Sequence, residues 1–361
     1  MAPAPSPATA PPLLDALIIG AGQAGLAAGY YLQQAGANFL LLDAGSTIGH
    51  SWTQRYDSLR LFSPAWSSAL PGRPWPGNPL RYPTKDETAA YLSDYAAQFR
   101  LPIRLPETVI SVAPAPAPAA TYLVRTASGQ TFHTRRVIIS TGPYTCPNIP
   151  AFGAHLPAAV PQLAGQQYQR PTQLPGAGPV AVVGSGNSAL QIAADLAATG
   201  RPVFVAFDEQ TPTMSNNTFV WALLRLTSLL AVPRHTGLGR YMHHQPEPVV
   251  SGDLARLRRF PNAHFIGRAE DALPDGRLRG RHATTPPLEA VVWATGYRPN
   301  YDFVHLPIFD AEGRPRHQRG LTAAPGVAFL GLDWLDSRRS ALLFGAGPDA
   351  RRVTRRLMRN E

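Results

Sequence analysis

Two glycine-rich segments have the spacing that proteins use to hold the diphosphate of a dinucleotide. The first runs Gly20-Ala21-Gly22-Gln23-Ala24-Gly25, and the second runs Gly184-Ser185-Gly186-Asn187-Ser188-Ala189. In such a turn the first glycine makes the bend and the second lets the backbone approach the diphosphate. The third packs the following helix against the strand, and the helix N-terminus directs N–H groups at the negative charge. The sequence therefore predicts two dinucleotide sites, the second with the tolerated alanine at its third glycine position.

An acidic residue follows each turn at the end of the next expected strand. Asp43 lies eighteen residues after Gly25, where a carboxylate can accept hydrogen bonds from both hydroxyls of an adenosine ribose. Asp208 ends the equivalent strand of the second unit and should repel the 2′-phosphate of NADP, which an arginine normally meets there. Alternatively, Asp208 and Glu209 only face solvent. These features alone do not distinguish FAD from NAD.

The residues around both turns predict the elements that position them. Apolar runs at 13–19 and 39–42 flank a helical stretch that ends at Gln34, and the same succession recurs at 180–183, 190–198 and 203–206. Further buried strands are expected at 290–294 and 327–330, with a helix in the C-terminal tail. The repetition predicts an α/β fold with two Rossmann-like domains rather than one.

Two short turns resemble each other and follow expected strands. They are Ser140-Thr141-Gly142 and Ala294-Thr295-Gly296. A turn of this kind places backbone N–H groups beside a bound cofactor and lets the chain cross between domains. We assign Thr295 and Gly296 to the second site on this basis.

Composition narrows the class of protein. The 361 residues are 44% apolar, which is enough for two domains, and the formal charge is +10. The basic residues are arginines apart from Lys85. Five of them cluster at 351–359, where we expect a solvated helix face rather than a nucleic-acid surface, because no basic motif with interleaved aromatic residues accompanies them.

Cysteine usage bears on redox chemistry and compartment. Cys146 is the sole cysteine, so we expect no disulfide, no redox pair and no metal site built on cysteine. This favours a reducing, cytoplasmic location. We expect Cys146 to be a buried structural thiol, with a redox-active cysteine that forms a sulfenic acid in a peroxide-handling oxidase as the alternative.

Two segments are candidates for targeting or membrane insertion, and neither fits. Residues 1–12 are expected to form a disordered tail rather than a signal peptide. The apolar stretch at 219–232 is too short to span a membrane and contains Arg225. We expect a helix at 219–226 that packs in the core, with substrate access as the alternative role.

At residues 49–61 the sequence GHSWTQRYDSLRL is similar to the GxxWxxRYxxLRL stretch of flavin-containing monooxygenase-like proteins. The closer similarity is to their bacterial subgroup often labelled flavoproteins of potassium transport. The segments YPTK at 82–85, ATGYRP at 294–299 and FLG at 329–331 follow in the order that this subgroup shows. The resemblance extends over residues 13–358.

The resemblance implies that FAD binds the first fold and that a nicotinamide cofactor binds the second, which is inserted into the first. The implied divisions are a FAD-binding domain at 13–165 and 286–361 and an NAD(P)-binding domain at 166–285. The FAD residues are expected to be Gly20, Gly22, Gln23, Ala24, Gly25, Asp43, Trp52, Arg55, Val109, Thr141 and Gly142. The NAD(P) residues are expected to be Gly184, Ser185, Gly186, Asn187, Ser188, Asp208, Thr295 and Gly296.

The sequence departs from the family at two places. Of the family's FxGxxxHxxxY fingerprint, expected at 158–168, only Tyr168 fits, and Ala164 stands where the histidine belongs. Asp208 stands where the family places an arginine. The family therefore favours NADPH whereas Asp208 favours NADH, and both remain open.

By resemblance, the expected function is that of an FAD-dependent, NAD(P)H-oxidising monooxygenase acting through a C4a-hydroperoxyflavin on a small organic substrate. We assign no catalytic side chain, because the flavin carries the chemistry. The alternatives are an NAD(P)H oxidase or reductase that inserts no oxygen, and a dinucleotide-sensing regulator. The expected partners are the substrate and dioxygen, without nucleic acid or a membrane span, and a homodimer is left open.

Overall fold

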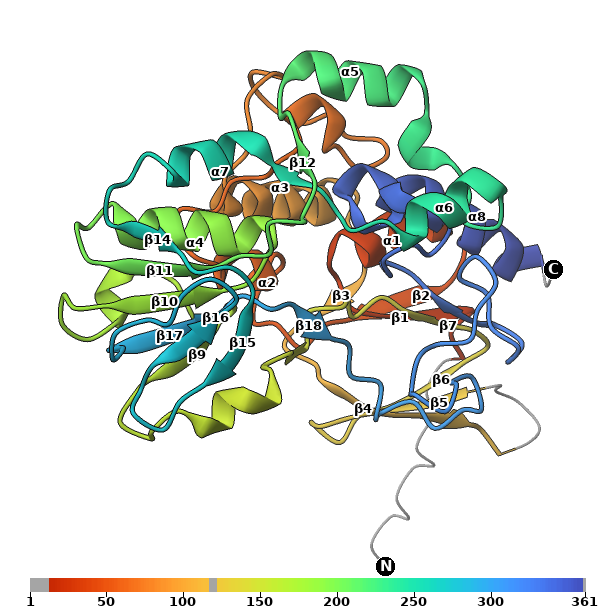
Figure 1. Cartoon of the computed structure of the whole chain (residues 1–361). Helices are drawn as coiled ribbons and strands as arrows, with labels where there is room; N and C mark the ends of the chain where they lie inside the picture. The colour runs from red at the N-terminus through yellow and green to blue at the C-terminus, as the bar shows by residue number, and fades with distance from the viewer. Residues whose placement is uncertain (1–12, 117–121, 360–361) are drawn as a thin grey trace, which may run out of the picture.

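Two lobes, each built on a five-stranded parallel sheet, make up the computed structural model, which describes residues 13–116 and 122–359 (Figure 1). The strand order of the first sheet is β19-β7-β1-β2-β3, and that of the second is β14-β11-β10-β17-β9. The first sheet contains β1 (Ala16–Ile19), β2 (Phe39–Leu42), β3 (Ile103–Arg104), β7 (Val137–Ile139) and β19 (Val327–Phe329). The second contains β9 (Gln162–Ala164), β10 (Val180–Val183), β11 (Val203–Ala206), β14 (Ala263–Phe265) and β17 (Ala290–Trp293).

The central strands are continuous apolar runs because both faces of each sheet are covered. In the first sheet Ile18 pairs with Leu41 of β2 and with Ile138 of β7. In the second sheet Val182 of β10 occupies the equivalent position between β11 and β17. The two sheets therefore share the same strand arrangement, in which the strand before each glycine turn lies at the centre.

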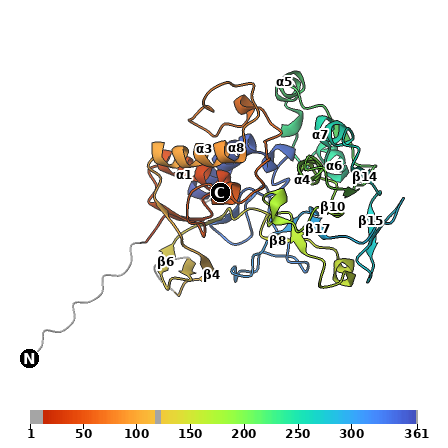
Figure 2. The same ribbon diagram turned by 90° about the vertical axis from the view of Figure 1, so that its left-hand side faces the viewer.

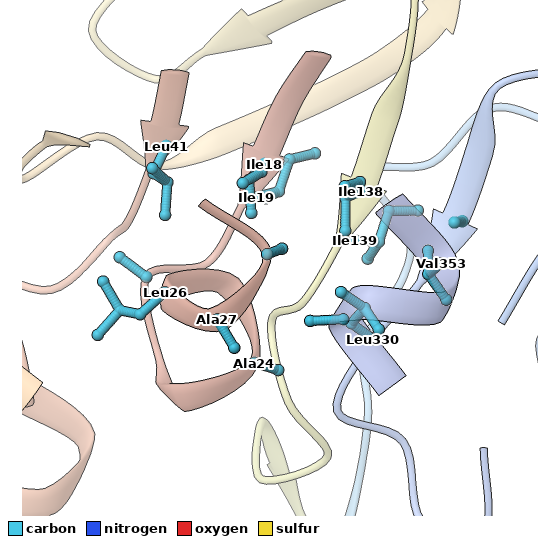
Figure 3. Close-up of a cluster of buried hydrophobic side chains, with 14 of the residues drawn as sticks. Ile18, Ile19, Ala24, Leu26, Ala27, Leu41, Ile138, Ile139, Leu330 and Val353 are labelled. Carbon is cyan, nitrogen blue, oxygen red and sulfur yellow. The ribbon is translucent and has the colours of Figure 1, made fainter. Parts of the chain in front are cut away.

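Helices cover one face of the first sheet, and a small antiparallel sheet covers the other. The helices are α1 (Gln23–Gln34) and α8 (Leu343–Arg359), and the antiparallel strands are β4 (Val109–Pro114), β5 (Tyr122–Thr126) and β6 (Thr131–Thr134). Figure 3 shows Leu26 and Ala27 of α1 gathered with strand residues and with Val353 of α8. The small alanine side chains of α1 let the helix lie close to the sheet, so the glycine turn that precedes it is held by a dry core.

The second sheet is also covered on both faces. One face packs against α4 (Asn187–Ala197) and α7 (Ser251–Leu257), and the other against η2 (Ala151–His155) and the hairpin of β15 (Ala269–Ala272) and β16 (Leu278–Gly280). Trp293, at the end of β17, is buried in the second of these layers, and its indole N–H donates to Gln162 Oε1 at 2.9 Å.

Further elements complete the lobes, and one pair of short strands connects them. The first lobe carries α2 (His50–Thr53), η1 (Ala65–Ser67), α3 (Lys85–Gln98) and η5 (Arg338–Ala341), and the second carries η3 (Pro171–Gln173). Strands β8 (Cys146–Pro147) and β18 (Tyr297–Arg298) pair antiparallel where the chain leaves and re-enters the first lobe. The pairing holds the two crossover segments side by side.

A helical arm leaves the second lobe and returns to it. We define the arm as residues 218–244, which form α5 (Thr218–Leu226), η4 (Leu229–Ala231) and α6 (Gly237–His244). Its two ends are joined at the base by the pairing of β12 (Thr213–Met214) with β13 (Val249–Val250). In Figure 1 the arm reaches across the top of the molecule toward α8 of the first lobe.

The predicted fold class is confirmed: both sheets are parallel, and the strands of the second lie in the chain between β7 and β19 of the first. The predicted boundaries at 165/166 and 285/286 are wrong for two strands, because β9 and β17 both pair within the second sheet. A buried strand has the same apolar residue pattern in either sheet, so its sequence does not indicate which sheet it joins. We propose boundaries at the β8–β18 crossover instead.

Three smaller expectations have different outcomes. Residues 1–12, expected to be a disordered tail, lie outside the described residues. Cys146 is exposed rather than buried. The helix expected at 219–226 forms as α5, but of its residues only Trp221 is buried, so it is not a core helix. Among the described residues, no helix is long and apolar enough to cross a membrane.

Candidate dinucleotide sites

The first glycine turn is fixed by backbone packing that leaves no room for side chains at two positions. Gly20 has φ +102°, and a Cβ there would lie 2.5 Å from the Ser140 carbonyl oxygen. A Cβ on Gly25 would lie 1.9 Å from the Gly20 carbonyl oxygen. By contrast, nothing lies within 4 Å of the Cβ position of Gly22. The turn is therefore packed from behind and open in front.

The first turn of α1 offers unpaired N–H groups at this open side. Its N-cap is Gly22, which supplies no side-chain cap, and the first turn contains no acidic residue. The first N–H groups of a helix have no intrahelical acceptor, and the helix dipole adds positive charge at this end. The arrangement suits a diphosphate group.

Two other segments converge on this turn. The Ser140 hydroxyl contacts the carbonyl oxygens of Ile19 and Gly20, each at 2.9 Å. Gly142 follows with φ +74° and open space at its Cβ position. On the opposite side the chain bends at Gly331, where a Cβ would lie 3.1 Å from the Ala24 Cβ. The turns after β1, β7 and β19 thus form one edge of the first sheet.

Asp43 lies where a ribose acceptor was expected, but its carboxylate also has a structural role. Its Oδ2 accepts the Ala21 N–H at 2.6 Å, and its Oδ1 accepts the Gly45 N–H at 2.7 Å. The Asp43 carbonyl oxygen accepts the Glu107 N–H, which brings the start of β4, with Val109, to the same side. A carboxylate has about four acceptor positions, so Asp43 can hold the turn and still accept a ribose hydroxyl.

The GxxWxxRY segment leads from the first lobe to the second. Trp52 lies in α2 and packs, partly buried, against the first core. Tyr56 is buried in the second core, where its hydroxyl donates to Gln191 Oε1 of α4 at 2.9 Å. Burial raises the pKa of Tyr56, whereas its contact with Ser188 lowers it. This segment therefore fixes α4 relative to the first lobe.

Lys85 holds the loop at residues 53–57 of the same segment through two polar contacts. It is buried, and its Nζ donates to the Thr53 carbonyl oxygen at 3.1 Å and pairs with Asp57 at 3.3 Å. Thr84 caps α3 in a capping box with Glu87. The YPTK sequence thus starts a helix and positions a buried cation under the loop that contains Arg55.

The second glycine turn repeats the first. Gly184 has φ +151°, and a Cβ there would lie 2.2 Å from the Ala294 carbonyl oxygen, whereas nothing lies within 4 Å of the Gly186 Cβ position. The first turn of α4 again has no side-chain cap and no acid. Gly296 has φ +85° with open space, and Thr295 is fastened through its Oγ1 to the Asn148 carbonyl oxygen at 2.7 Å.

The polar side chains of the second turn have protein partners. Ser185 Oγ accepts the Asp208 N–H, and Asn187 Oδ1 accepts the Val250 N–H, each at 2.8 Å. These bonds hold the strand after α4 and the start of α7 against the turn. Ser185 and Asn187 therefore shape the second site, and direct contact of their oxygens with a cofactor is not needed for that role.

A cation lies beside Asp208, which sequence reasoning did not identify. Arg268 NH1 is 3.8 Å from Asp208 Oδ2, and Arg268 is 67% exposed. Arg268 follows β14, which pairs with β11 at the edge of the sheet. No signal in the sequence connects it to Asp208, because sixty residues separate them and only the sheet order makes them neighbours.

The two sites meet through three side chains. The Arg55 guanidinium carbon lies 4.7 Å from the ring centroid of Tyr144 and 5.4 Å from that of Tyr297, and the two rings are 5.4 Å apart. Tyr144 stands two residues after Gly142, and Tyr297 directly follows Gly296. The carboxyl edges of the two sheets therefore face one another across this cluster.

Sequence reasoning also missed an acidic residue beside the first glycine turn. Asp333 follows Gly331 by two residues. The residue is exposed, but surrounding protein atoms partly desolvate its carboxyl and raise its pKa to about 6, with the charge of Glu247 adding to the effect. The charge of Asp333 in turn adds to the pKa increase that burial causes in Tyr301. The sequence FLGLD at 329–333 carried a signal, because a polar residue just after a strand and glycine lies at the edge where ligands bind.

The residues at the fingerprint positions, both Tyr168, which fits, and Ala164, which does not, have structural roles. Tyr168 is fully buried in the second core, and its hydroxyl donates to Asp195 Oδ2 at 2.8 Å. Ala164 ends β9, and Gly165 follows with its N–H bonded to the Trp293 carbonyl oxygen. In this chain the stretch therefore serves the second core.

Dinucleotides fit both turns on the evidence of the residues present. Each turn combines a forced close approach behind, a Cβ position open to space in front and an uncapped helix start. An acidic residue lies at the end of the following strand in both copies. These are the properties required to hold a diphosphate and an adjoining ribose.

Comparisons with known proteins agree with this geometry. A family model described as pyridine nucleotide-disulphide oxidoreductase matches residues 17–227. The chain is 38% identical over 344 residues to an uncharacterized CzcO-like oxidoreductase of Geobacillus kaustophilus, covering 94% of this chain and 96% of the relative. It is 27% identical to the indole-3-pyruvate monooxygenase YUCCA8 of Oryza sativa subsp. indica, covering 93% and 89%. It also matches a flavin-containing monooxygenase from Stenotrophomonas maltophilia with a TM-score of 0.79 and 26% identity, covering 96% and 98%.

Substitutions at Gly22 and Gly25 should separate cofactor binding from folding. Gly22 has φ −74° and ψ −174°, which leucine can adopt, and its Cβ position is open. Gly22→Leu should therefore fold normally but block the diphosphate and yield protein without FAD. Gly25→Ala places a Cβ against the Gly20 carbonyl, so it should also lower the free energy of unfolding by about 1–3 kcal/mol.

The measurements are the FAD-to-protein ratio of each purified variant and its thermal unfolding after flavin removal. Gly252→Leu is the matched control, because the nearest atom to its Cβ position is 3.9 Å away. Gly129 also has an open Cβ position, but its φ of +84° would strain a leucine. A Gly22→Leu protein that retains one FAD per chain would contradict the assignment.

Because Asp333 is exposed and solvent screens its charge, Asp333→Asn should stabilise the protein by a small amount that depends on pH. The pKa of Asp333 rises from an ordinary 3.8 to about 6 in the folded chain. The folded state therefore binds more protons than the unfolded state between these values, and stability falls as the pH rises through this window. The gain in thermal midpoint from the Asn variant should grow between about pH 4 and pH 6 and then stay constant. A gain that is the same at all pH values would refute a raised pKa as its cause.

Proposed function

The chain belongs to the pyridine nucleotide-disulphide oxidoreductase family, and from this premise we propose that it is a monooxygenase that inserts one atom of dioxygen into a small organic substrate. The predicted class, an FAD- and NAD(P)H-dependent oxidoreductase of flavin monooxygenase type, is confirmed by the relatives. The family name refers to disulphide reduction, which uses a cysteine pair. The present sequence has one cysteine, Cys146, and cannot form that pair.

One observation carries the proposal: the two open glycine turns belong to sheet edges that face each other. The Tyr144 and Tyr297 rings, each one or two residues from a cofactor turn, are in edge contact at 5.4 Å. A cofactor on each turn would extend from its own sheet toward the same crossover. This arrangement suits transfer between two bound dinucleotides rather than two independent binding functions.

When bound, FAD would supply the redox chemistry between the nicotinamide and dioxygen. The residues of this chain would bind and orient the cofactors. The N-terminal turns of α1 and α4 would hold the diphosphates through backbone N–H groups, and Asp43, which fixes the first turn, would accept a hydrogen bond from the ribose. Arg55, held between two tyrosine rings, fixes the relative orientation of the two sheet edges.

The helical arm packs on the first lobe, where it would limit the access of water to the proposed flavin site from one side. Trp221 of α5 stacks on Phe62 with ring centroids 6.3 Å apart and meets Phe344 edge-on at 6.4 Å. His243 of α6 contacts the Trp334 ring edge-on at 5.2 Å. Exclusion of water is required because reduced flavin that meets oxygen in an open site releases peroxide.

We propose that NADH serves at least as well as NADPH. Asp208 lies at the end of β11, where its carboxylate can accept from ribose hydroxyls but repels a 2′-phosphate. Arg268 compensates part of this charge from 3.8 Å. Because Arg268 is 67% exposed, solvent screens its contribution, and we therefore expect the charge of Asp208 to dominate.

Asp208→Asn should shift the coenzyme preference toward NADPH. Removing the negative charge lowers repulsion of the 2′-phosphate, so kcat/KM for NADPH relative to NADH should rise about tenfold. Arg268→Gln should move the ratio in the opposite direction. The ratio is measured by steady-state NAD(P)H oxidation, with Asp302→Asn, an exposed acid of the first lobe, as the control. A strong NADPH preference that Asp208→Asn leaves unchanged would refute this proposal.

Oxygen insertion is tested by the fate of dioxygen. With an accepted substrate, the peroxide released per NAD(P)H oxidised should fall well below one, and a label from ¹⁸O₂ should appear in the product. Candidate sulfides, ketones and amines are screened by these two measurements together. If every candidate left the peroxide yield stoichiometric and the products unlabelled, the protein would be an oxidase instead.

A further inference from the structure

The arm carries most of the large apolar side chains that the described part of the molecule leaves exposed. Ten such side chains are exposed, and six of them lie between positions 219 and 241: Phe219, Leu223, Leu226, Leu229, Leu238 and Tyr241. Single exposed apolar residues are ordinary on a protein surface, but a contiguous group indicates an interaction site.

On α5 these side chains form one stripe that faces away from the protein. Phe219, Leu223 and Leu226 follow the i, i+4, i+7 spacing and are 76%, 47% and 84% exposed. Trp221 projects to the opposite side, where it is buried against Phe62. Both views show α5 at the outer edge of the molecule (Figures 1 and 2).

The second helix of the arm has the same division. Leu238 and Tyr241 of α6 are 53% and 65% exposed at i, i+3 spacing, whereas His243 turns inward to the Trp334 ring. Leu229 is exposed on the connection between the helices. Each helix thus uses one side to pack on the protein and leaves an apolar side without a partner in the described chain.

The charge of the arm is of one sign. No aspartate or glutamate occurs between Glu209 and Glu247, whereas Arg225, Arg234 and Arg240 lie in this interval. Arg234 and Arg240 are exposed and form no ion pair within the described residues. His235 and His244 are exposed as well.

The arm is anchored, so its apolar face is formed in advance. The Arg234 N–H donates to the Asp336 carbonyl oxygen at 2.7 Å, and Pro233 bridges to Ser337 in the first lobe. At the base, Thr213 pairs with Val249. Binding through this face therefore requires no folding of the arm.

We propose that the arm docks the protein on an anionic membrane surface, with the α5 and α6 apolar side chains in the interfacial layer and Arg234 and Arg240 at lipid phosphates. An amphipathic helix with arginine at its flanks and Leu, Phe and Tyr on its apolar face has the composition of an interfacial helix. A second copy of the chain is the competing occupant. It would bring the arginines of two arms together without an acid on either, so charge favours the membrane.

The experiment uses the full chain as purified and vesicles of phosphatidylcholine with roughly one third phosphatidylglycerol. Protein should sediment with these vesicles at low salt, and much less with pure phosphatidylcholine or at high salt. Leu226→Ser should weaken the partition coefficient roughly tenfold or more, because a leucine side chain loses its apolar environment. Arg240→Gln should weaken it about fivefold.

Ile110→Ser is the matched control, because Ile110 is 52% exposed on the antiparallel sheet of the first lobe. It should leave vesicle binding unchanged, and all variants should keep the circular dichroism of the parent. The proposal is overturned if the parent fails to bind the anionic vesicles at low salt, or if Ile110→Ser reduces binding as much as Leu226→Ser. It is equally overturned if sedimentation equilibrium shows a dimer that Leu226→Ser dissociates and vesicle binding is absent.

Discussion

The structure depends on the contact of two backbone segments at each glycine turn. The Gly20 bend lies against the Ser140 carbonyl, and the Gly184 bend lies against the Ala294 carbonyl, both closer than a Cβ would allow. This approach brings the strand that precedes each crossover segment, β7 or β17, next to the turn and lets the following helix begin directly at the sheet edge. The helix N-terminus is thereby exposed to a ligand while its remaining length is buried. Everything that we infer about cofactors follows from that geometry.

The second constraint is the way in which the two sheets are joined. An inserted domain must leave and re-enter its host, and here both passages follow directly from cofactor turns and pair as β8 and β18. Arg55 and two tyrosine rings fill the space between them. Because Arg55 comes from the same segment as Tyr56, which is buried in the second core, one loop of the first lobe determines where the second lobe sits.

The sequence predicted the local helices and strands, but it did not predict which distant segments lie beside them. β2, β10 and β11 have the bounds expected from their apolar runs, because a short run between turn residues has few alternatives. The placement of β9 and β17 failed, since sheet membership is decided by pairing over more than a hundred residues. Arg268 and Tyr144 were missed for the same reason: each becomes relevant only through a neighbour from a distant segment. Asp333 was accessible in principle, because its position after a strand and a glycine is a local feature.

Charge distribution links these observations. Both proposed diphosphate sites consist of backbone N–H groups and helix ends, with no lysine or arginine in either turn. The acids nearest the turns, Asp43 and Asp208, make the local side-chain charge negative. The net charge of +10 therefore does not originate in cofactor binding, although the cofactors are anions. Part of the excess lies on the arm, where three arginines accompany exposed apolar side chains without an acid among them. The exposed apolar side chains are unfavourable in water, and the arginines repel another basic protein. An anionic membrane interface would bury the apolar side chains and pair the arginines with lipid phosphates.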